Sequence, residues 1–207
     1  MNIRDIVSLT PVIAAIPATE PAHAVPLARA LTAGGLRVLE ISLQGPGAIA
    51  CIDTIRKALP EAIVGVGGLT KAADFAAAGR VGAHFGATPG LTPELAAAAR
   101  GARFPVLPGV MTPTDVVVAQ HTGFKVLKLF PAEIAGGARM LQMLGDSFPD
   151  LEFYAAGGIS RDGAPKYLAL PNVICVGGSW VAPKSMIDAA DWPGIEALAR
   201  DAASLTK

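Results

Sequence analysis

Short runs of apolar residues alternate along the chain with longer alanine- and leucine-rich stretches. The short runs predict β-strands, because they are rich in β-branched residues and are bounded by glycine, proline or charged residues. Near-continuous apolar strands are typical of a parallel sheet that is covered on both faces. The predicted strands cover residues 9–16, 36–43, 62–67, 82–88, 104–108, 125–130, 151–156 and 172–177.

The stretches between these strands predict amphipathic helices, several of which carry start and stop signals. Thr92 and Thr112 each stand before a proline, which is the pattern of an N-cap followed by the first helical turn. Gly79 and Gly123 predict helix ends. The predicted helices are Thr19–Thr32, Pro46–Leu59, Thr70–Ala78, one that begins at Thr92, one from Thr112 to Gly123, Ala135–Leu144, Ala164–Leu170 and Trp192–Leu205.

This order of elements predicts a single domain over residues 1–207, folded as a compact (β/α)8 TIM barrel with about 25 residues per unit. An open doubly wound sheet is the alternative, and that fold usually has a glycine-rich turn after its first strand. Here the glycine-rich turns come late, at Gly157-Gly158 and at Gly177-Gly178-Ser179. The barrel is favoured, because its usual phosphate site is built from the last two strand–helix loops.

Composition narrows the classes of function. The 207 residues include 17 basic and 17 acidic ones, so the formal net charge is zero, and 52% are hydrophobic. Zero net charge argues against nucleic acid or an anionic membrane as a partner, since both need a basic face. No apolar run approaches the roughly 20 residues of a spanning helix. The apolar excess therefore fits strands that are buried on both faces.

The first residues loosely resemble a secretory signal, with a basic residue, an apolar stretch and small residues over 4–24. Asp5, Pro11 and Pro17 interrupt that apolar stretch. We therefore expect a first core strand here rather than a signal sequence.

The cysteines and histidines predict no metal or disulfide framework. Cys51 and Cys175 lie far apart in apolar contexts, which is typical of reduced core thiols in a cytoplasmic protein. His23, His84 and His121 are scattered, and none has a second ligand at metal spacing. We expect neither a metal nor another cofactor.

Two charged residues lie in the middle of predicted strands, with apolar residues on both sides. Glu40 alternates with Leu39 and Ile41, so it points into a barrel whose helices cover the two apolar neighbours; an edge strand with Glu40 in solvent is the alternative. Lys128 lies within the apolar run 125–130 and points inward by the same rule, unless it snorkels out or simply pairs with a carboxylate. A lysine amine can form a Schiff base with a carbonyl carbon, and a carboxylate can move protons. The pair therefore predicts a catalytic site.

Around these residues the sequence resembles a known family, from about Pro11 to Pro183. The segments that carry the resemblance are LEISL at 39–43, PGLTPEL at 89–95, LPGVMTP at 107–113, KLFPAE at 128–133, GGIS at 157–160 and YLALPNVICVGGSW at 167–180. They are similar to the motifs of 2-keto-3-deoxy-6-phosphogluconate (KDPG) aldolases.

The resemblance implies a class I, metal-free aldolase, usually a homotrimer, that cleaves its phosphorylated keto acid to pyruvate and glyceraldehyde 3-phosphate. It implies that Lys128 forms the Schiff base and that Glu40 shuttles protons. It also implies a substrate pocket with walls at Pro89 and Phe130 and phosphate-binding turns at Gly157, Gly158, Gly178 and Ser179.

Three positions depart from the family pattern. Gln44 stands where an arginine binds the substrate carboxylate, Gly68 replaces a threonine that touches the same group, and Ala156 replaces a threonine before the phosphate glycines. A neutral amide binds a carboxylate less strongly than the bidentate arginine does. The related 6-phosphogalactonate aldolases carry a neutral amide at that point. Alternatives are therefore a 6-phosphogalactonate or 4-hydroxy-2-oxoglutarate aldolase, a phosphosugar isomerase or epimerase, or a catalytically weakened phospho-ligand-binding homologue.

Overall fold

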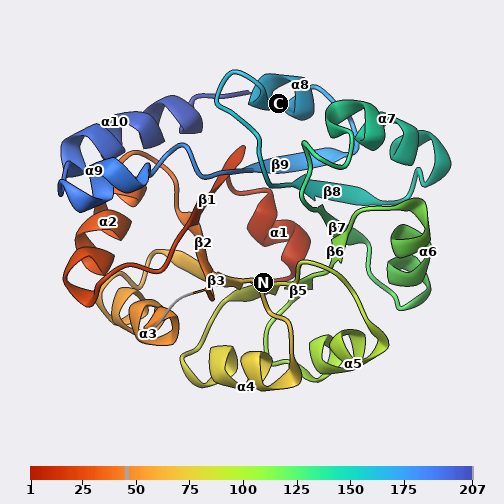
Figure 1. The fold of residues 1–207 in the computed structure, drawn as a ribbon, viewed down its shortest axis with the longest axis horizontal. Coiled ribbons are helices and arrows are strands. Elements are labelled where there is room, and N and C mark those ends of the chain that lie inside the picture. The colour runs from red at the N-terminus through yellow and green to blue at the C-terminus, as the bar shows by residue number, and fades with distance from the viewer. Residues whose placement is uncertain (45–46, 207) are drawn as a thin grey trace.

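The structure is a computed structural model that describes residues 1–44 and 47–206. Its parallel strands form a ring, with most of the helices outside it (Figure 1). The strands are β1 (Val12–Ile16), β2 (Val38–Ser42), β3 (Ile63–Gly67), β4 (Phe85–Ala87), β5 (Val106–Leu107), β6 (Gly109–Val110), β7 (Val126–Leu129), β8 (Glu152–Ala155) and β9 (Val173–Gly178). The helices are α1 (Ile3–Val7), α2 (Pro21–Ala33), α3 (Ala48–Ala58), α4 (Ala72–Arg80), α5 (Pro93–Gly101), α6 (Pro113–His121), α7 (Gly137–Ser147), α8 (Ala164–Leu168), α9 (Lys184–Asp188) and α10 (Trp192–Ala203).

The barrel closes at a strand that proline divides. The sheet order of the described residues is β5-β4-β3-β2-β1-β9-β8-β7-β6, so β5 and β6 stand at its two ends. Only Pro108 separates them in the chain, and it has no N–H to donate to the ladder. Its carbonyl accepts the Lys128 N–H at 2.8 Å. The predicted strand 104–108 thus shortens to β5, and β6 lies just beyond its predicted end. The two short strands join the ends of the sheet, which confirms the barrel and excludes the doubly wound alternative.

Two apolar layers lie on the two sides of the strands, as the alternation predicts. Leu39, Ile41, Leu127 and Leu129 belong to the layer between the strands and the helices. The second layer fills the barrel and consists of Ile6, Val7, Ile13, Val38, Phe85, Ala87, Leu107, Val126, Tyr154, Ala156, Ile174 and Cys175. Inward-pointing side chains therefore form a packed core beneath any site at the mouth of the barrel.

Helix α1, which the sequence pattern did not predict, lies inside the ring of strands (Figure 1). Asn2 caps it, because its side chain accepts the Asp5 N–H at 2.9 Å. Ile6 and Val7 are buried in the barrel layer together with Val38, the first residue of β2. The helix therefore closes the amino-terminal end of the barrel.

Several predicted helix boundaries shift. Helix α4 runs through Gly79 and ends at Arg80, and the glycine with the left-handed backbone is Gly82, at φ +69°. The predicted helix start at Pro46 lies outside the described residues, and α3 begins at Ala48. Thr92 and Thr112 cap α5 and α6 as predicted.

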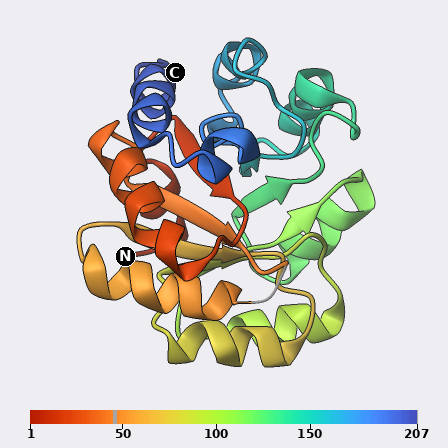
Figure 2. The ribbon, with the colours of Figure 1, turned by 60° about the vertical axis from the view of Figure 1, so that its left-hand side comes forward.

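The first long helix and the last helix of the chain lie side by side, α2 against α10, which closes the outer ring (Figures 1 and 2). Gly34 permits this approach, since a Cβ there would be 2.4 Å from Ala199 Cβ. Over residues 1–44 and 47–206, no helix combines the length and apolar character needed to cross a membrane.

Candidate active site

A cavity of about 390 Å³ opens at the carboxyl ends of the strands, where barrel enzymes place their chemistry. It lies at the end of the barrel opposite α1. Its lining residues are Ala15, Ile16, Pro17, Glu40, Ser42, Gln44, Gly67, Gly68, Thr70, Pro89, Lys128, Phe130, Ala156, Gly157, Gly158, Gly177 and Ser179.

Lys128 and Glu40 are in contact at the bottom of this cavity. Lys128 Nζ donates to Glu40 Oε1 at 2.5 Å, and the two residues are only 5% and 6% exposed. They come from β7 and β2, which lie on opposite arms of the sheet order. The inward orientation follows from the alternation of each strand, and the alternatives of an edge strand and of a snorkelling lysine are wrong. The alternative that Lys128 pairs with a carboxylate agrees with its contact to Glu40, so a catalytic role of the pair stays a prediction. A buried ion pair costs desolvation, which is accepted where the charges have a function.

The second oxygen of Glu40 has a different partner. Tyr154, on β8, donates its hydroxyl to Glu40 Oε2 at 3.1 Å and is fully buried. Burial raises the pKa of the Tyr154 phenol well above its usual range, and the charge of Glu40 raises it further. The phenol therefore stays protonated and keeps donating to the carboxylate.

Two aromatic rings flank the amine of Lys128. The nitrogen lies 5.2 Å from the ring centroid of Phe130 and 5.3 Å from that of Tyr154. Both distances lie within the range of cation–π contacts. The paired strands place Tyr154 directly beside Lys128. The rings restrict the amine to one region of the cavity, next to the carboxylate.

Gly67 makes room for the carboxylate. A Cβ at this position would lie 2.3 Å from Glu40 Oε1, so any side chain there would collide with Glu40. Its neighbour Gly68 has a left-handed backbone, at φ +79°. Glycine is thus required at position 67 by the Glu40 carboxylate, whereas at position 68 it relieves the strain of a left-handed backbone.

A glycine turn after β8 forms one end of the cavity. Gly157 and Gly158 both have positive φ, +98° and +83°, which glycine adopts without strain. Successive backbone N–H groups in such turns make concave anion-binding sites. Ser179, after β9, adds a hydroxyl to the same cavity. This end of the site therefore has the chemistry of a phosphate-binding site.

Gly178 is not among the lining residues of the cavity; its neighbours Gly177 and Ser179 are. A Cβ at Gly178 would lie 2.8 Å from Val12 and 2.9 Å from the Trp180 ring. A side chain at Gly178 would therefore collide with a strand and an indole, and a contribution of the Gly178 backbone to phosphate binding stays a prediction.

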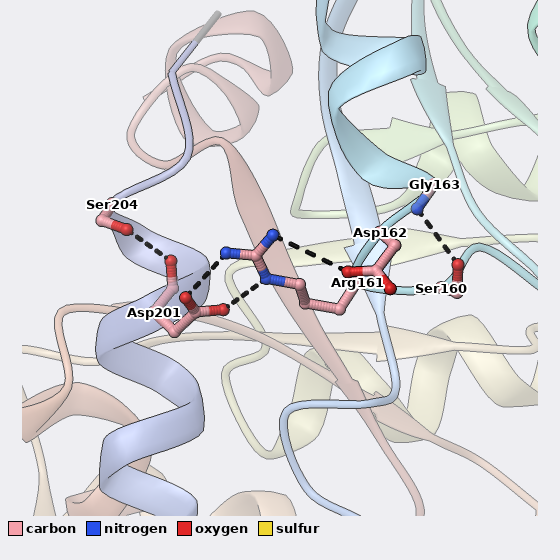
Figure 3. Close-up of polar contacts among 6 residues, drawn as sticks. All are labelled: Ser160, Arg161, Asp162, Gly163, Asp201 and Ser204. Atoms are coloured by element: carbon pink, nitrogen blue, oxygen red, sulfur yellow. Dashed lines mark hydrogen bonds and ion pairs between the residues drawn. The ribbon is translucent and has the colours of Figure 1, made fainter.

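The loop that follows the glycine turn is tied to the last helix (Figure 3). Arg161 donates from Nε and Nη2 to the two carboxylate oxygens of Asp201, at 2.7 and 2.8 Å. The hydrogen bonds from Arg161 lower the pKa of Asp201. The bidentate contact links the Gly157–Ser160 turn to α10.

The opposite end of the cavity carries neutral polar groups. Ser42 and Gln44 come from the end of β2, and Gly68 and Thr70 follow β3. The Thr70 hydroxyl lies 3.4 Å from Asp74 Oδ2, which also accepts the Thr70 N–H at 2.9 Å. This end offers hydroxyl and amide donors without a cationic side chain among its lining residues.

Most predicted site residues converge on this one cavity. Those in its lining are Glu40, Gln44, Gly68, Pro89, Lys128, Phe130, Ala156, Gly157, Gly158 and Ser179. Two residues of the site are not among the predicted ones: the sequence pattern predicts only a helix start at Thr70 and an apolar strand around Tyr154. The alternation that placed Glu40 inward also places Tyr154 inward, so a signal for it was present.

A separate polar contact lies near the amino-terminal ends of the strands. Arg56 Nη1 is 2.9 Å from His84 Nδ1, and the Val64 N–H points to the same nitrogen at 3.0 Å. Burial lowers the pKa of His84, and the charge of Arg56 lowers it further. Within the described part of the chain, no group of three or more His, Cys, Asp or Glu residues could hold a metal ion.

Known proteins resemble this chain over nearly its whole length. The family model described as KDPG and KHG aldolase matches residues 3–198. A 2-dehydro-3-deoxy-phosphogluconate aldolase of Pseudoalteromonas atlantica is 39% identical, over 96% of this chain and 93% of its own length. The KHG/KDPG aldolase of Escherichia coli K12 is 40% identical over the same shares.

A solved structure has the same fold as this chain. A KDPG aldolase from Legionella pneumophila, with pyruvate captured as a covalent carbinolamine intermediate, superposes with a TM-score of 0.96 at 35% identity and covers 99% of both chains. The match thus extends from the sequence to the path of the backbone. With its cavity at the carboxyl ends of a closed barrel, this chain belongs to the KDPG and KHG aldolase family.

Proposed function

We propose that this protein is a class I aldolase that cleaves KDPG to pyruvate and glyceraldehyde 3-phosphate. The observation that carries the proposal is the buried pair of Lys128 Nζ and Glu40 Oε1, 2.5 Å apart at the bottom of a cavity with a glycine turn at one end. Relatives of about this length carry the same activity in their names. The two side chains supply a nucleophile and a proton carrier at the same point.

The first step joins the substrate to Lys128. The ammonium passes a proton to Glu40 Oε1 across their contact, which frees the amine to attack the C2 ketone. Glu40 gives that proton to the oxygen of the resulting carbinolamine, which loses water and leaves an iminium ion on Lys128 and a carboxylate at Glu40. The pyruvate carbinolamine of the Legionella relative supports a covalent route of this kind.

The second step breaks the carbon chain. Glu40 removes the proton from the C4 hydroxyl, the C3–C4 bond breaks, and its electron pair moves toward the iminium to give an enamine and the free aldehyde. Glu40 then returns the proton to C3, and water hydrolyses the iminium to release pyruvate and restore the Lys128 amine. Glu40 lies in contact with Lys128 and can therefore reach both carbons without a large movement.

The different polar groups at the two ends of the cavity support one orientation of the substrate. The phosphate lies at Gly157, Gly158 and Ser179, where N–H groups and a hydroxyl can surround an anion. The carboxylate lies at the neutral end, against Ser42, Gln44 and Thr70. Because no arginine lines that end in the described part of the chain, 6-phosphogalactonate-type and 4-hydroxy-2-oxoglutarate substrates are the second candidates.

Pyruvate release tests the proposal against its rivals. With KDPG as substrate and lactate dehydrogenase as the coupling enzyme, an aldolase produces pyruvate continuously. An isomerase or epimerase would alter the sugar acid without forming pyruvate, and a binding protein would bind the phosphoester without turnover. Absence of pyruvate from KDPG and from the two alternative substrates would overturn the proposal.

We also propose that the protein assembles as a homotrimer, as its family resemblance implies. Large apolar side chains are exposed on α6 and around α7: Val118 is 40% exposed, Met143 40% and Ile134 78%. These helices are neighbours on one side of the ring (Figure 1). Light scattering after size exclusion tests the proposal, and a monomeric mass would contradict it.

We propose, further, that the protein is located in the cytoplasm. Cys51 and Cys175 are both buried in the apolar layers, where reduced thiols serve as small packing groups. The substrate is a phosphorylated metabolite. Fractionation of the source cells tests this directly, and recovery with the secreted or envelope fraction would contradict it.

A further inference from the structure

The two oxygens of Glu40 have different partners on different strands. Oε1 accepts from Lys128 on β7, at 2.5 Å, and Oε2 accepts from the Tyr154 hydroxyl on β8, at 3.1 Å. The reaction proposed above changes only the first of these contacts, because Lys128 Nζ becomes bonded to a substrate carbon. The second contact involves no reacting atom.

Tyr154 is built to hold this contact. The side chain is fully buried and lies beneath the cavity rather than in its lining. Gly177 on the adjacent strand makes room for the hydroxyl, since a Cβ there would lie 2.5 Å from the phenol oxygen. The raised pKa of the phenol, caused first by burial and then by the charge of Glu40, keeps its proton in place.

We propose that Tyr154 is a positioning residue that fixes Glu40 through Oε2, so that Oε1 is the oxygen that carries the substrate proton. This inference rests on the proposed aldolase function. When Lys128 turns to the substrate, Oε1 loses its partner while the carboxylate stays anchored at Oε2. Oε1 then accepts the C4 hydroxyl proton and later gives it to C3, and the phenol keeps its own proton throughout.

The experiment separates the two halves of the reaction. Tyr154→Phe removes only the hydroxyl and keeps the ring beside Lys128. Schiff-base formation is measured by borohydride trapping of pyruvate, and proton transfer by exchange of the pyruvate methyl protons in D2O. We expect the final yield of trapped adduct within about twofold of wild type, because the yield does not depend on how fast Glu40 moves protons. Exchange should be slowed about 10- to 100-fold, since a misplaced base loses its advantage.

Tyr167→Phe is the matched control. Tyr167 also donates its hydroxyl to a glutamate, Glu133, and that pair lies outside the lining of the site. Pyruvate has no phosphate, so neither trapping nor exchange should change in this variant. A second route to the same defect is Gly177→Ala, whose methyl group would displace the Tyr154 hydroxyl. It should also lose exchange selectively, with trapping as the internal check on folding.

The outcomes are distinct. Normal exchange in Tyr154→Phe, or an equal loss of trapping and exchange, would overturn the positioning role. In a Glu40→Gln background, adding Tyr154→Phe should slow exchange no further, and a full additional loss would also count against the role. If wild-type protein traps no pyruvate, the proposed function fails first, and the result is not confused with a failure of this inference.

Discussion

The two ends of the barrel interior are built from the same strands with opposite chemistry. At the amino-terminal end, Ile6 and Val7 of α1 pack with Val38 and Val126 in a buried apolar layer, the floor of the barrel. At the carboxyl end, the inward residues that follow on the same two strands are Glu40 and Lys128. A shift of two residues along β2 or β7 thus changes an inward valine into an inward charge.

The difference shows how a chain with few charges uses them. Only 16% of the residues are charged, and the interior places an opposed pair directly above an apolar layer. Such a floor excludes water, which strengthens electrostatic interactions above it. The floor supplies stability and the mouth supplies chemistry, so mutations at the two ends should have separable effects.

The largest effect is expected at the mouth. Lys128→Met should abolish aldolase activity and lower the unfolding free energy by about 3–5 kcal/mol, because Glu40 is left buried without its cationic partner. Lys128→Met combined with Glu40→Leu should recover much of the stability and none of the activity. Urea unfolding and pyruvate release measure both. Recovery of activity in the double variant would contradict the division between floor and mouth.

At the floor, Ile6→Ala should cost about 2–5 kcal/mol of unfolding free energy and leave kcat on folded protein unchanged, since it opens a cavity far from the reacting atoms. Leu9→Ala is the matched control, because Leu9 is 53% exposed and its truncation should cost less than about 0.5 kcal/mol. A large fall in kcat for Ile6→Ala, at temperatures where the variant is folded, would show that the two ends of the barrel do not have separable effects.

Gln44→Arg sharpens the assignment of the carboxylate end. A charge-assisted contact contributes about 1.5–3 kcal/mol, so the KM for KDPG should fall about 10-fold or more if the carboxylate lies there. Comparison of kcat/KM on the gluconate and galactonate substrates reads out specificity in the same assay. Gln44→Met, of similar length and without donors, should raise KM, and an unchanged KM in both variants would move the carboxylate elsewhere.

The smallest effect concerns His84, near the amino-terminal end. Burial and then Arg56 lower its pKa below the usual value of about 6.5, so the unfolded chain takes up a proton more readily than the folded one. The stability that depends on neutral His84 is present above about pH 6.5 and is lost as pH falls through the folded-state pKa. His84→Asn should flatten this part of the Tm–pH curve, and an unchanged slope would contradict the assignment.

The barrel and its reactive pair could be predicted because both depend on local pattern. Alternation in single strands placed Glu40 and Lys128 inward, and the late glycine turns located the mouth. Helix α1 could not be predicted, because its five residues are too few to show a helical periodicity. Its stability comes from the burial of Ile6 and Val7.

Contacts across the barrel were beyond such reasoning. The link from Tyr154 to Glu40 joins residues on β8 and β2, and no single strand contains both. The need for glycine at position 67 likewise depends on the rotamer of Glu40 on the neighbouring strand. Gly178 looked like a cavity residue because it stands in a glycine-rich turn, yet Val12 and Trp180 enclose it.

The most direct test of the central claim is reduction of the enzyme with borohydride in the presence of pyruvate, followed by peptide mass spectrometry. We expect one reduced pyruvyl adduct on Lys128 in wild-type protein and none in Lys128→Ala. The nearby Lys125, three residues earlier in the chain, is the internal reference and should remain unmodified. An adduct on Lys125, or no adduct at all, would contradict the assignment of Lys128 as the nucleophile.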